Sequence, residues 1–206
     1  MNLLRRGLLV SRDKYVMLHK LRDTFEGTCN IPVSNGYIVA FDYLITETSS
    51  TRFSLFGKGG TGATVNISYN GVSLFAEMFI STSYVESIFY STPSLPLNTV
   101  MRVELKVEDD GSGGVDLTMS LNGSVVATKN KAARVLSSNM TIFLNDNTDT
   151  VATNTMIANV IVRNAARTQT LLDVPLQGDF STLAGSLVIS GIDGVDYEFV
   201  EQTPLT

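Results

Sequence analysis

Apolar and polar residues alternate with a period of two along much of this chain after residue 25. The pattern is clearest in residues 101–108, where Met, Val, Leu and Val alternate with Arg, Glu, Lys and Glu, and it resumes in residues 115–122. A turn-rich loop, 109–114, separates these runs, and Asn122-Gly123 is a two-residue turn signal before residues 124–128 run back. The pattern predicts a three-stranded antiparallel meander whose strands have one wet face and one dry face.

Other runs extend this pattern to most of the chain. Residues 37–45 are apolar at nearly every position, so the strand that they predict should be covered on both faces. Asn70-Gly71 predicts a hairpin between the runs 65–69 and 72–79. No long amphipathic helix is expected, and short strands at fairly regular spacing predict an all-β sandwich or barrel. Further strands are predicted at residues 52–56, 140–144, 156–162, 187–190 and 195–200.

The charges divide the chain into two parts. Residues 1–22 hold six of the 15 basic residues and one of the 20 acids, a net charge of +5, which leaves −10 for residues 23–206. We interpret residues 1–22 as a basic N-terminal arm that docks on an acidic partner, with a solvated terminal segment as the alternative. Residues 23–206 contain no obvious linker and are predicted to form one domain, whose acidity argues against nucleic acid as a partner. The candidate docking residues are Arg5, Arg6, Arg12, Lys14, Lys20 and Arg22.

The chain contains one histidine, His19, and one cysteine, Cys29. A Ser-His-Asp or Cys-His pair would have to use His19, which stands in the basic arm outside the strand pattern. A zinc site needs more such ligands, and an intrachain disulfide needs a second cysteine. No apolar run reaches the roughly 18 residues of a membrane span. We therefore expect no catalytic residues, no cofactor and no membrane partner.

Acidic residues suggest two further sites, a glycosidase centre and a calcium site. A retaining glycosidase needs two carboxylates about 5–5.5 Å apart. The run from Glu104 to Asp110 alternates with basic residues before it enters a loop, so we interpret it as a solvated edge. Residues 145–149 offer oxygen ligands for calcium, although Asn, Asp and Thr are also ordinary turn residues. Asp146 and Asp149 are therefore weak calcium candidates, and no metal site is predicted from them.

Three parts of the chain resemble the concanavalin A-like jelly roll in its laminin G-like form. Phe25-Glu26-Gly27 leads to the strand 37–45, and residues 102–123 read as a strand, a Gly/Asp loop and a strand that ends in Asn-Gly. Residues 156–162 resemble the late strand that closes such domains. The resemblance covers roughly residues 23–165 and implies a two-sheet antiparallel β-sandwich of the kind found in bacteriophage surface proteins, which the N-terminal arm expected from the charges would precede. The family includes lectins, glycosidases and adhesion domains, so the fold does not select a function.

Glycan binding often stacks a sugar on an aromatic side chain, most often Trp, and this chain has no Trp. We favour a core position for the aromatic candidates, because large aromatic side chains dominate buried area. The candidates are Tyr69, Tyr84, Phe89 and Tyr90.

The first functional hypothesis is a non-enzymatic virion protein, namely a bacteriophage capsid decoration, head-fibre or tail-associated subunit. Such a subunit would be made in the host cytoplasm and dock on other virion proteins through residues 1–22, as a homo-oligomer for which we expect a trimer. The alternative is a carbohydrate-binding module or lectin for a host-surface glycan, with calcium dependence left open. A glycosidase or lyase ranks below both, because the sequence has no matching acid pair on a strand face.

Overall fold

The computed structural model describes the chain in segments, and all structural statements below concern these residues. The described residues are 16–17, 25–27, 31–33, 36–45, 53–57, 64–81, 84–92, 94–131, 136, 139–140, 142, 155–174, 186–190 and 196–201.

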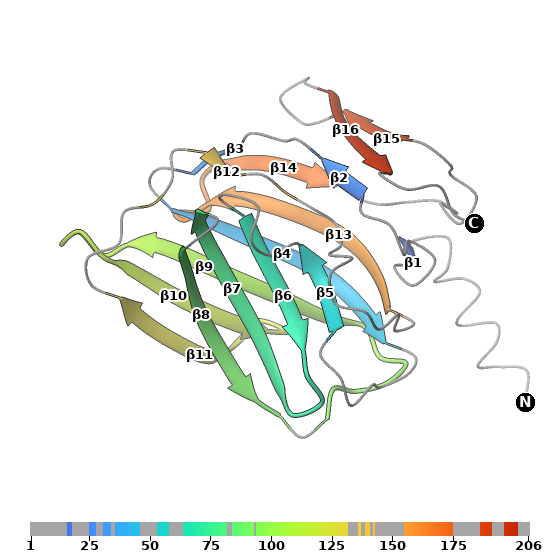
Figure 1. Cartoon of the computed structure of the whole chain (residues 1–206), viewed down its shortest axis with the longest axis horizontal. Helices are drawn as coiled ribbons and strands as arrows, with labels where there is room; N and C mark the ends of the chain where they lie inside the picture. Colours follow the sequence, from blue (N-terminus) through green and yellow to red (C-terminus); the bar gives the residue numbers. More distant parts are fainter. Residues whose placement is uncertain are drawn as a thin grey trace, which may run out of the picture.

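The largest element is a seven-stranded antiparallel sheet with the order β1-β13-β4-β9-β10-β11, in which β14 also pairs with β13. Strand β4 lies in the interior of this sheet, between β13 and β9, so strands far apart in the sequence are neighbours (Figure 1). The strands are β1 (Val16–Met17), β4 (Tyr37–Ile45), β9 (Met101–Asp109), β10 (Val115–Leu121), β11 (Ser124–Lys131), β13 (Thr155–Asn164) and β14 (Thr170–Val174).

A four-stranded antiparallel sheet packs against one face of the larger sheet and makes a sandwich. Its order is β5-β6-β7-β8, and in Figure 1 it lies in front of β4, β9 and β10. Its strands are β5 (Phe53–Gly57), β6 (Thr64–Tyr69), β7 (Ser73–Ser81) and β8 (Tyr84–Ser91). The fold prediction, an all-β two-sheet antiparallel sandwich, is confirmed.

Two small sheets complete the described strands. Strand β12 pairs with β3, and β16 pairs with both β15 and β2. No helix in the described part of the chain is long and apolar enough to cross a membrane. The small-sheet strands are β2 (Phe25–Gly27), β3 (Ile31–Pro32), β12 (Asn139–Met140), β15 (Ser186–Ser190) and β16 (Asp196–Glu201).

The hydrophobic core lies between the two large sheets and takes every second side chain of the facing strands. Phe41 of β4 stacks on Phe56 of β5, with ring centroids 4.8 Å apart and planes inclined by 24°. In β9 the core residues are Val103, Leu105 and Val107, each fully buried. They are the apolar half of the alternation in residues 101–108, so the predicted dry face of this strand is confirmed.

Strand β4 is also covered on the face that points away from this core. Ile38, Ala40 and Leu44 are 1%, 4% and 3% exposed, although their neighbours in sequence are the ones that face the core. Asp42 is the half-buried polar residue of this outer face. The prediction of a strand buried on both faces is therefore confirmed, and on the outer face Ile38 lies between the longer side chains of its pairing partners Arg163 and Lys106.

The turn between β10 and β11 forms as predicted at Asn122-Gly123. Both residues have positive φ, 49° and 82°, which a two-residue hairpin of the primed type requires. The Asn122 side chain also accepts a 2.8 Å hydrogen bond from the backbone N–H of Arg102. The turn is thereby tied to the neighbouring strand β9.

The hairpin between β6 and β7 forms one residue later than predicted. The backbone N–H of Asn70 donates to the carbonyl of Ser73, so the central residues of the turn are Gly71 and Val72. Gly71 has a φ of 89° at the first central position, as glycine does in type II′ turns. The Asn70 side chain accepts hydrogen bonds from the backbone N–H groups of Val72 and Ser73, which fixes it before the turn.

The edge strands β8 and β11 join the two sheets through a partly buried charge cluster. Glu86 of β8 is 5% exposed, and its carboxylate lies 3.4 Å from the ammonium of Lys129 and 3.9 Å from that of Lys131. Lys129 also donates a 2.7 Å hydrogen bond to the carbonyl of Ser87. A buried carboxylate needs such partners, so this edge of the sandwich is closed by ion pairs.

Candidate ligand-binding site

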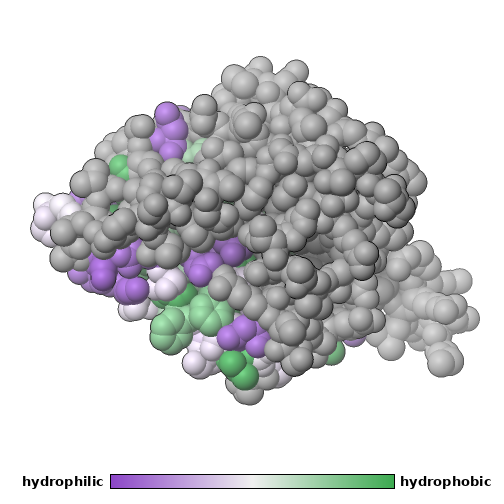
Figure 2. All heavy atoms as spheres, in the orientation of Figure 1, coloured by the Kyte–Doolittle hydropathy of each residue, from purple (hydrophilic) through white to green (hydrophobic). Residues whose placement is uncertain are grey.

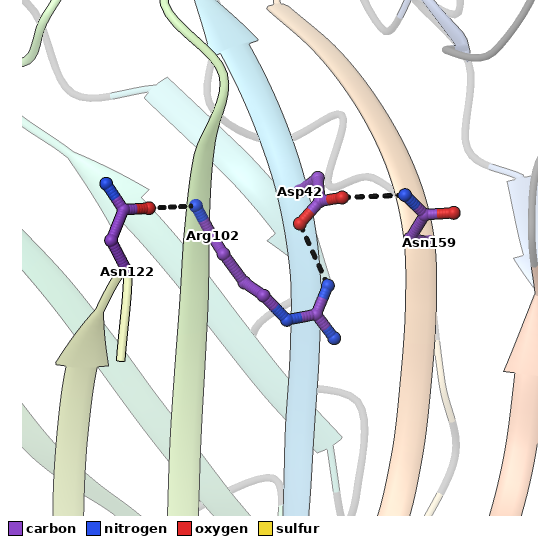
Figure 3. Close-up of polar contacts among 4 residues, drawn as sticks. All are labelled: Asp42, Arg102, Asn122 and Asn159. Atoms are coloured by element: carbon purple, nitrogen blue, oxygen red, sulfur yellow. Dashed lines mark hydrogen bonds and ion pairs between the residues drawn. The ribbon is translucent and has the colours of Figure 1, made fainter. Parts of the chain in front are cut away.

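The outer face of the seven-stranded sheet carries a hollow of about 510 Å³. It lies on the side of this sheet that faces away from β5–β8. Figure 3 looks onto this face, with the strands of the smaller sheet behind β4 and β9. Strands β4, β9, β10, β11 and β13 all contribute side chains, so the hollow rests on a continuous hydrogen-bonded sheet.

Strand register arranges the outward side chains of this hollow in rows across the sheet. Directly paired residues on neighbouring strands have their side chains about 4.5–5.5 Å apart at Cβ. The first row runs from β13 to β11 through Ile161, Ala40, Glu104, Ser120 and Val125. The second row runs from β13 to β10 through Arg163, Ile38, Lys106 and Thr118.

The floor of the hollow is apolar. It is formed by Ile38 and Ala40 of β4, which have almost no surface exposed to solvent. Arg167, in the turn between β13 and β14, binds the Glu104 carboxylate of β9 with both terminal nitrogens, one of them at 3.1 Å. In this row the residue between β13 and β9 is Ala40, whose methyl group leaves room for the arginine to cross β4. The bidentate pair therefore forms one wall of the hollow.

A chain of polar contacts fixes the opposite side of the site (Figure 3). Arg102 donates to one oxygen of Asp42 at 2.8 Å, and Asn159 donates to the other oxygen at 2.6 Å. Asn159 has a φ of 50° and stands at a register shift between β13 and β4, so a bulge carries its amide to Asp42. With the contact of Asn122 to the backbone of Arg102, the network spans β13, β4, β9 and the β10–β11 turn.

The hollow has an excess of positive charge. Among the described residues, four basic side chains line it, and three acids, Asp42, Glu104 and Glu108, pair with all of them except Arg163; the four are Arg102, Lys106, Arg163 and Arg167. Hydroxyl groups of Thr118 and Ser120 also line it. Its residues can therefore donate hydrogen bonds and attract an anion, over a small apolar floor.

The structure corrects the interpretation of Glu104 as part of a solvated edge. Strand β9 pairs with β4 on one side and β10 on the other, so it is an interior strand. The Glu104 side chain is 20% exposed and bound to Arg167. The alternation correctly predicted that Glu104 lies on the outer face of the sheet, but it contained no information on which strands pair with β9.

Neither outward carboxylate of the site is unpaired, since Asp42 binds Arg102 and Glu104 binds Arg167. Among the described residues no group of three or more His, Cys, Asp or Glu side chains could hold a metal ion. The arrangement is suited to holding a polar ligand by charge and hydrogen bonds.

Most residues singled out from the sequence lie outside the described residues. These include the six basic residues of the arm, Arg5, Arg6, Arg12, Lys14, Lys20 and Arg22, with His19 and Cys29, and the calcium candidates Asp146 and Asp149. Docking through the arm and calcium binding both stay predictions. Two residues within 1–22, Val16 and Met17, form β1 and pair with β13. The boundary between arm and domain also stays a prediction.

The aromatic candidates lie apart from the hollow. Tyr69 is 1% exposed and its hydroxyl donates to the carbonyl of Thr92 at 3.3 Å, so its predicted core position is confirmed. Tyr90 is half-buried against the core. Phe89 differs, because it is 62% exposed on the outer face of the smaller sheet, beside Phe75 with ring centroids 6.2 Å apart. The side chain of Tyr84 lies outside the described residues.

Figure 2 shows the molecule from the side of the smaller sheet. Hydrophobic residues reach the surface beside hydrophilic ones in the lower part of this view, where β7 and β8 run in Figure 1. The exposed apolar side chains on these strands and their turns include Val72 and Phe89.

Comparison with known proteins gives a class of fold. No family model matches the chain, and no curated protein sequence matches it. A solved structure described as the HCR/D F1240A mutant is similar, with a TM-score of 0.51 at 12% identity, over 66% of this chain and 35% of the other. The likeness shows the shared β-sandwich fold.

Two further solved structures are similar at a lower level. The botulinum neurotoxin serotype D binding domain has a TM-score of 0.46 at 11% identity, over 70% of this chain and 34% of its own. The binding domain of botulinum neurotoxin DC in complex with SialylT has a TM-score of 0.45 at 13% identity, over 63% of this chain and 32% of its own. The chain thus spans about a third of the length of the chains that it matches. Its resemblance to laminin G-like domains of bacteriophage proteins stays a prediction.

Proposed function

We propose that this chain is a non-catalytic glycan-binding domain whose binding site is the hollow on the outer face of the seven-stranded sheet. The observation that carries the proposal is the hollow itself, a concave surface of about 510 Å³ built on strands that pair continuously. This volume falls in the range of roughly 300–1,000 Å³ typical of small-ligand sites.

The chemistry of the lining suits a sugar. Sugar hydroxyls both donate and accept hydrogen bonds, and the hollow offers hydroxyls from Thr118 and Ser120 and a carboxylate from Glu104. The C–H face of a sugar ring can pack on the apolar side chain of Ile161 at one end of the row or on that of Val125 at the other end. Because none of the described residues that line this hollow is aromatic, the proposed binding uses hydrogen bonds and charge in place of ring stacking.

The non-catalytic part of the proposal rests on the pairing of the outward carboxylates. In a retaining glycosidase, one carboxyl group donates a proton and the other attacks the sugar. Here the oxygens of Asp42 and Glu104 accept hydrogen bonds from arginines, and from Asn159 in the case of Asp42. Release of reducing sugar from any polysaccharide in a hydrolysis screen would contradict this part.

The virion hypothesis is separate from the glycan-binding proposal. It requires docking through residues 1–22, whose basic side chains lie outside the described residues. The likeness of fold to neurotoxin binding domains does not support it. A virion subunit, its trimeric state and its place of synthesis stay predictions, and glycan binding is the function that the described residues support best.

Glycan arrays test the proposal, with two variants that change one hydroxyl residue each. Thr118→Ile removes a hydroxyl from the hollow and keeps a β-branched side chain that suits the strand. The expected result is binding of a defined glycan class by the wild type, weakened roughly threefold to tenfold in the variant, as for the loss of one neutral hydrogen bond.

The matched control is Ser91→Ile, at an exposed position of β8 on the other sheet. It should leave binding unchanged. Absence of binding to every glycan would refute the proposal, and equal losses in both variants would remove the hollow as its site. Repeating the array with a chelator shows whether calcium is required.

A further inference from the structure

We infer that the glycan taken by this hollow is acidic, carrying a carboxylate or a sulfate group that lies between Arg163 and Lys106. The inference rests on the proposed function and names the class of ligand. It is carried by a surplus of one basic side chain: of the four described cations that line the hollow, three pair with the carboxylates of Asp42, Glu108 and Glu104, and Arg163 does not.

The four basic side chains differ in how firmly they are engaged. Arg102 binds Asp42, which Asn159 holds from its other side, and Arg167 binds Glu104 with two nitrogens. Both guanidinium groups are therefore fixed by the protein itself. They shape the hollow and orient its walls, and they are not the groups most available to a ligand.

Lys106 and Arg163 are the available cations. Lys106 has a 2.6 Å contact with Glu108 on the same strand, with the two side chains 28% and 39% exposed. Such a solvent-exposed pair is worth little, so a ligand anion can replace it. Arg163 has no ion-pair partner among the residues that the structure describes, although it lines the hollow.

Strand register places these two cations on either side of one buried apolar residue. Ile38 of β4 pairs with Arg163 of β13 and with Lys106 of β9. The two backbone positions are thus two strand spacings apart, about 10 Å. Two long basic side chains can converge on a single anion across that distance. Thr118, next in the same row, adds a hydroxyl donor beside Lys106.

A single acidic group fits this arrangement better than a polyanion does. Nucleic-acid binding needs many phosphate contacts along a basic surface. Here each of the other three lining cations has a carboxylate partner, and the chain as a whole is acidic. A sugar acid or a sulfated sugar supplies one charge together with hydroxyls for the rest of the lining.

The test measures dissociation constants of the purified full chain for matched pairs of oligosaccharides by calorimetry. One pair is a uronic-acid or sialic-acid oligosaccharide and its carboxyl-reduced form, and the other is a sulfated oligosaccharide and its desulfated form. The wild type is expected to bind at least one acidic member about tenfold or more tightly than its neutral partner, because charge-assisted hydrogen bonds are the strong ones. The two pairs show whether the preferred group is a carboxylate or a sulfate.

Variants then assign the effect to the hollow. Arg163→Gln should abolish most of the preference for the acidic member and leave binding of the neutral member unchanged, and Arg163→Lys should keep part of it. The matched control is Lys131→Gln, which removes a cation at the edge near Glu86, outside the hollow. Lys131→Gln should leave the dissociation constants of both the acidic and the neutral member unchanged. Circular dichroism of each variant checks that it is folded.

The outcomes separate this inference from the proposed function. Equal binding of acidic and neutral members, both weakened by Thr118→Ile, would overturn the acidic ligand and leave glycan binding in place. No binding of any oligosaccharide would overturn both. A preference for acidic members that survives Arg163→Gln, or tighter binding of an oligonucleotide than of any glycan, would overturn the inference.

Discussion

Two tyrosines in the core show how much a single hydroxyl depends on its surroundings. The hydroxyl of Tyr43, on β4, is buried and has no hydrogen-bond partner among the described residues. Burial, with a smaller contribution from Tyr69, raises the pKa of Tyr43 above its ordinary value, so the hydroxyl stays protonated. Tyr69, on β6, is equally buried but donates its hydroxyl to the carbonyl of Thr92.

These surroundings predict opposite effects for the same substitution. Tyr43→Phe should raise the free energy of unfolding by about 1 kcal/mol, because an unsatisfied buried polar group costs about 1–3 kcal/mol. Tyr69→Phe, the matched control, should lower it by about 0.5–1.5 kcal/mol, since it removes a hydrogen bond. Urea unfolding of both variants measures the difference. Destabilisation by Tyr43→Phe as large as that by Tyr69→Phe would show that Tyr43 has a partner in the folded protein.

The sequence predicted the burial of some single residues correctly, but it did not predict their contact partners. The alternation in residues 101–108 predicted which β9 side chains are buried, because face is a local property of a strand. It could not predict that Glu104 would meet Arg167, since the pair depends on the position of a turn 63 residues away. Phe89 was expected in the core and is exposed. An aromatic residue indicates a large side chain, but it does not indicate toward which face of the sheet that side chain points.

At the scale of elements, the loop between β9 and β10 is organised by one carboxylate. Asp110 accepts hydrogen bonds from the backbone N–H groups of Ser112 and Gly114, from the Ser112 hydroxyl and from Asn130. These donors, with the Ser112 backbone first, lower the pKa of Asp110 from 3.8 to about 2. The ionised side chain is thus part of the loop structure.

This lowered pKa predicts a dependence of stability on pH. A folded-state pKa of about 2, below the ordinary 3.8, stabilises the fold above pH 3.8, and that contribution is lost as the pH falls through about 2. Asp110→Asn cannot titrate but keeps an acceptor oxygen. The wild type should therefore be more stable than the variant at pH 5, and the gap should close between about pH 4 and pH 2. Unfolding curves across this range measure the gap, and a gap that stays constant would contradict the account.

Turns and short strands mark the limit of prediction for elements. The Asn122-Gly123 turn was predicted and forms, because both residues tolerate the positive φ that it needs. The Asn70-Gly71 signal predicted the hairpin correctly but not which two residues are central in its turn. Asn70 precedes the central residues and stabilises the turn through its side chain, which accepts hydrogen bonds from Val72 and Ser73. Strand β14 was not predicted, because two leucines are adjacent in Thr170–Val174 and its apolar and polar residues therefore do not alternate.

At the scale of the molecule, the two sheets leave different faces to solvent. The smaller sheet presents apolar residues such as Phe89, whereas the outer face of the seven-stranded sheet presents the charged hollow. The sandwich itself was predictable, since alternation and turn signals are local. The hollow was not, because it depends on register between β4, β9 and β13, which are up to about 120 residues apart in the sequence. A register shift at Asn159 moves part of that alignment by a further residue.

The most direct test of the central claim is to map where a glycan binds on the folded chain. Amide chemical shifts of the isotope-labelled protein, followed during titration with the best oligosaccharide from the array, give this map residue by residue. The account predicts that the largest changes gather on β4, β9, β10 and β13 around Ile38, Lys106 and Arg163, and that β5–β8 change little. Changes centred on β7 and β8 near Phe89, or none at saturating glycan, would contradict it.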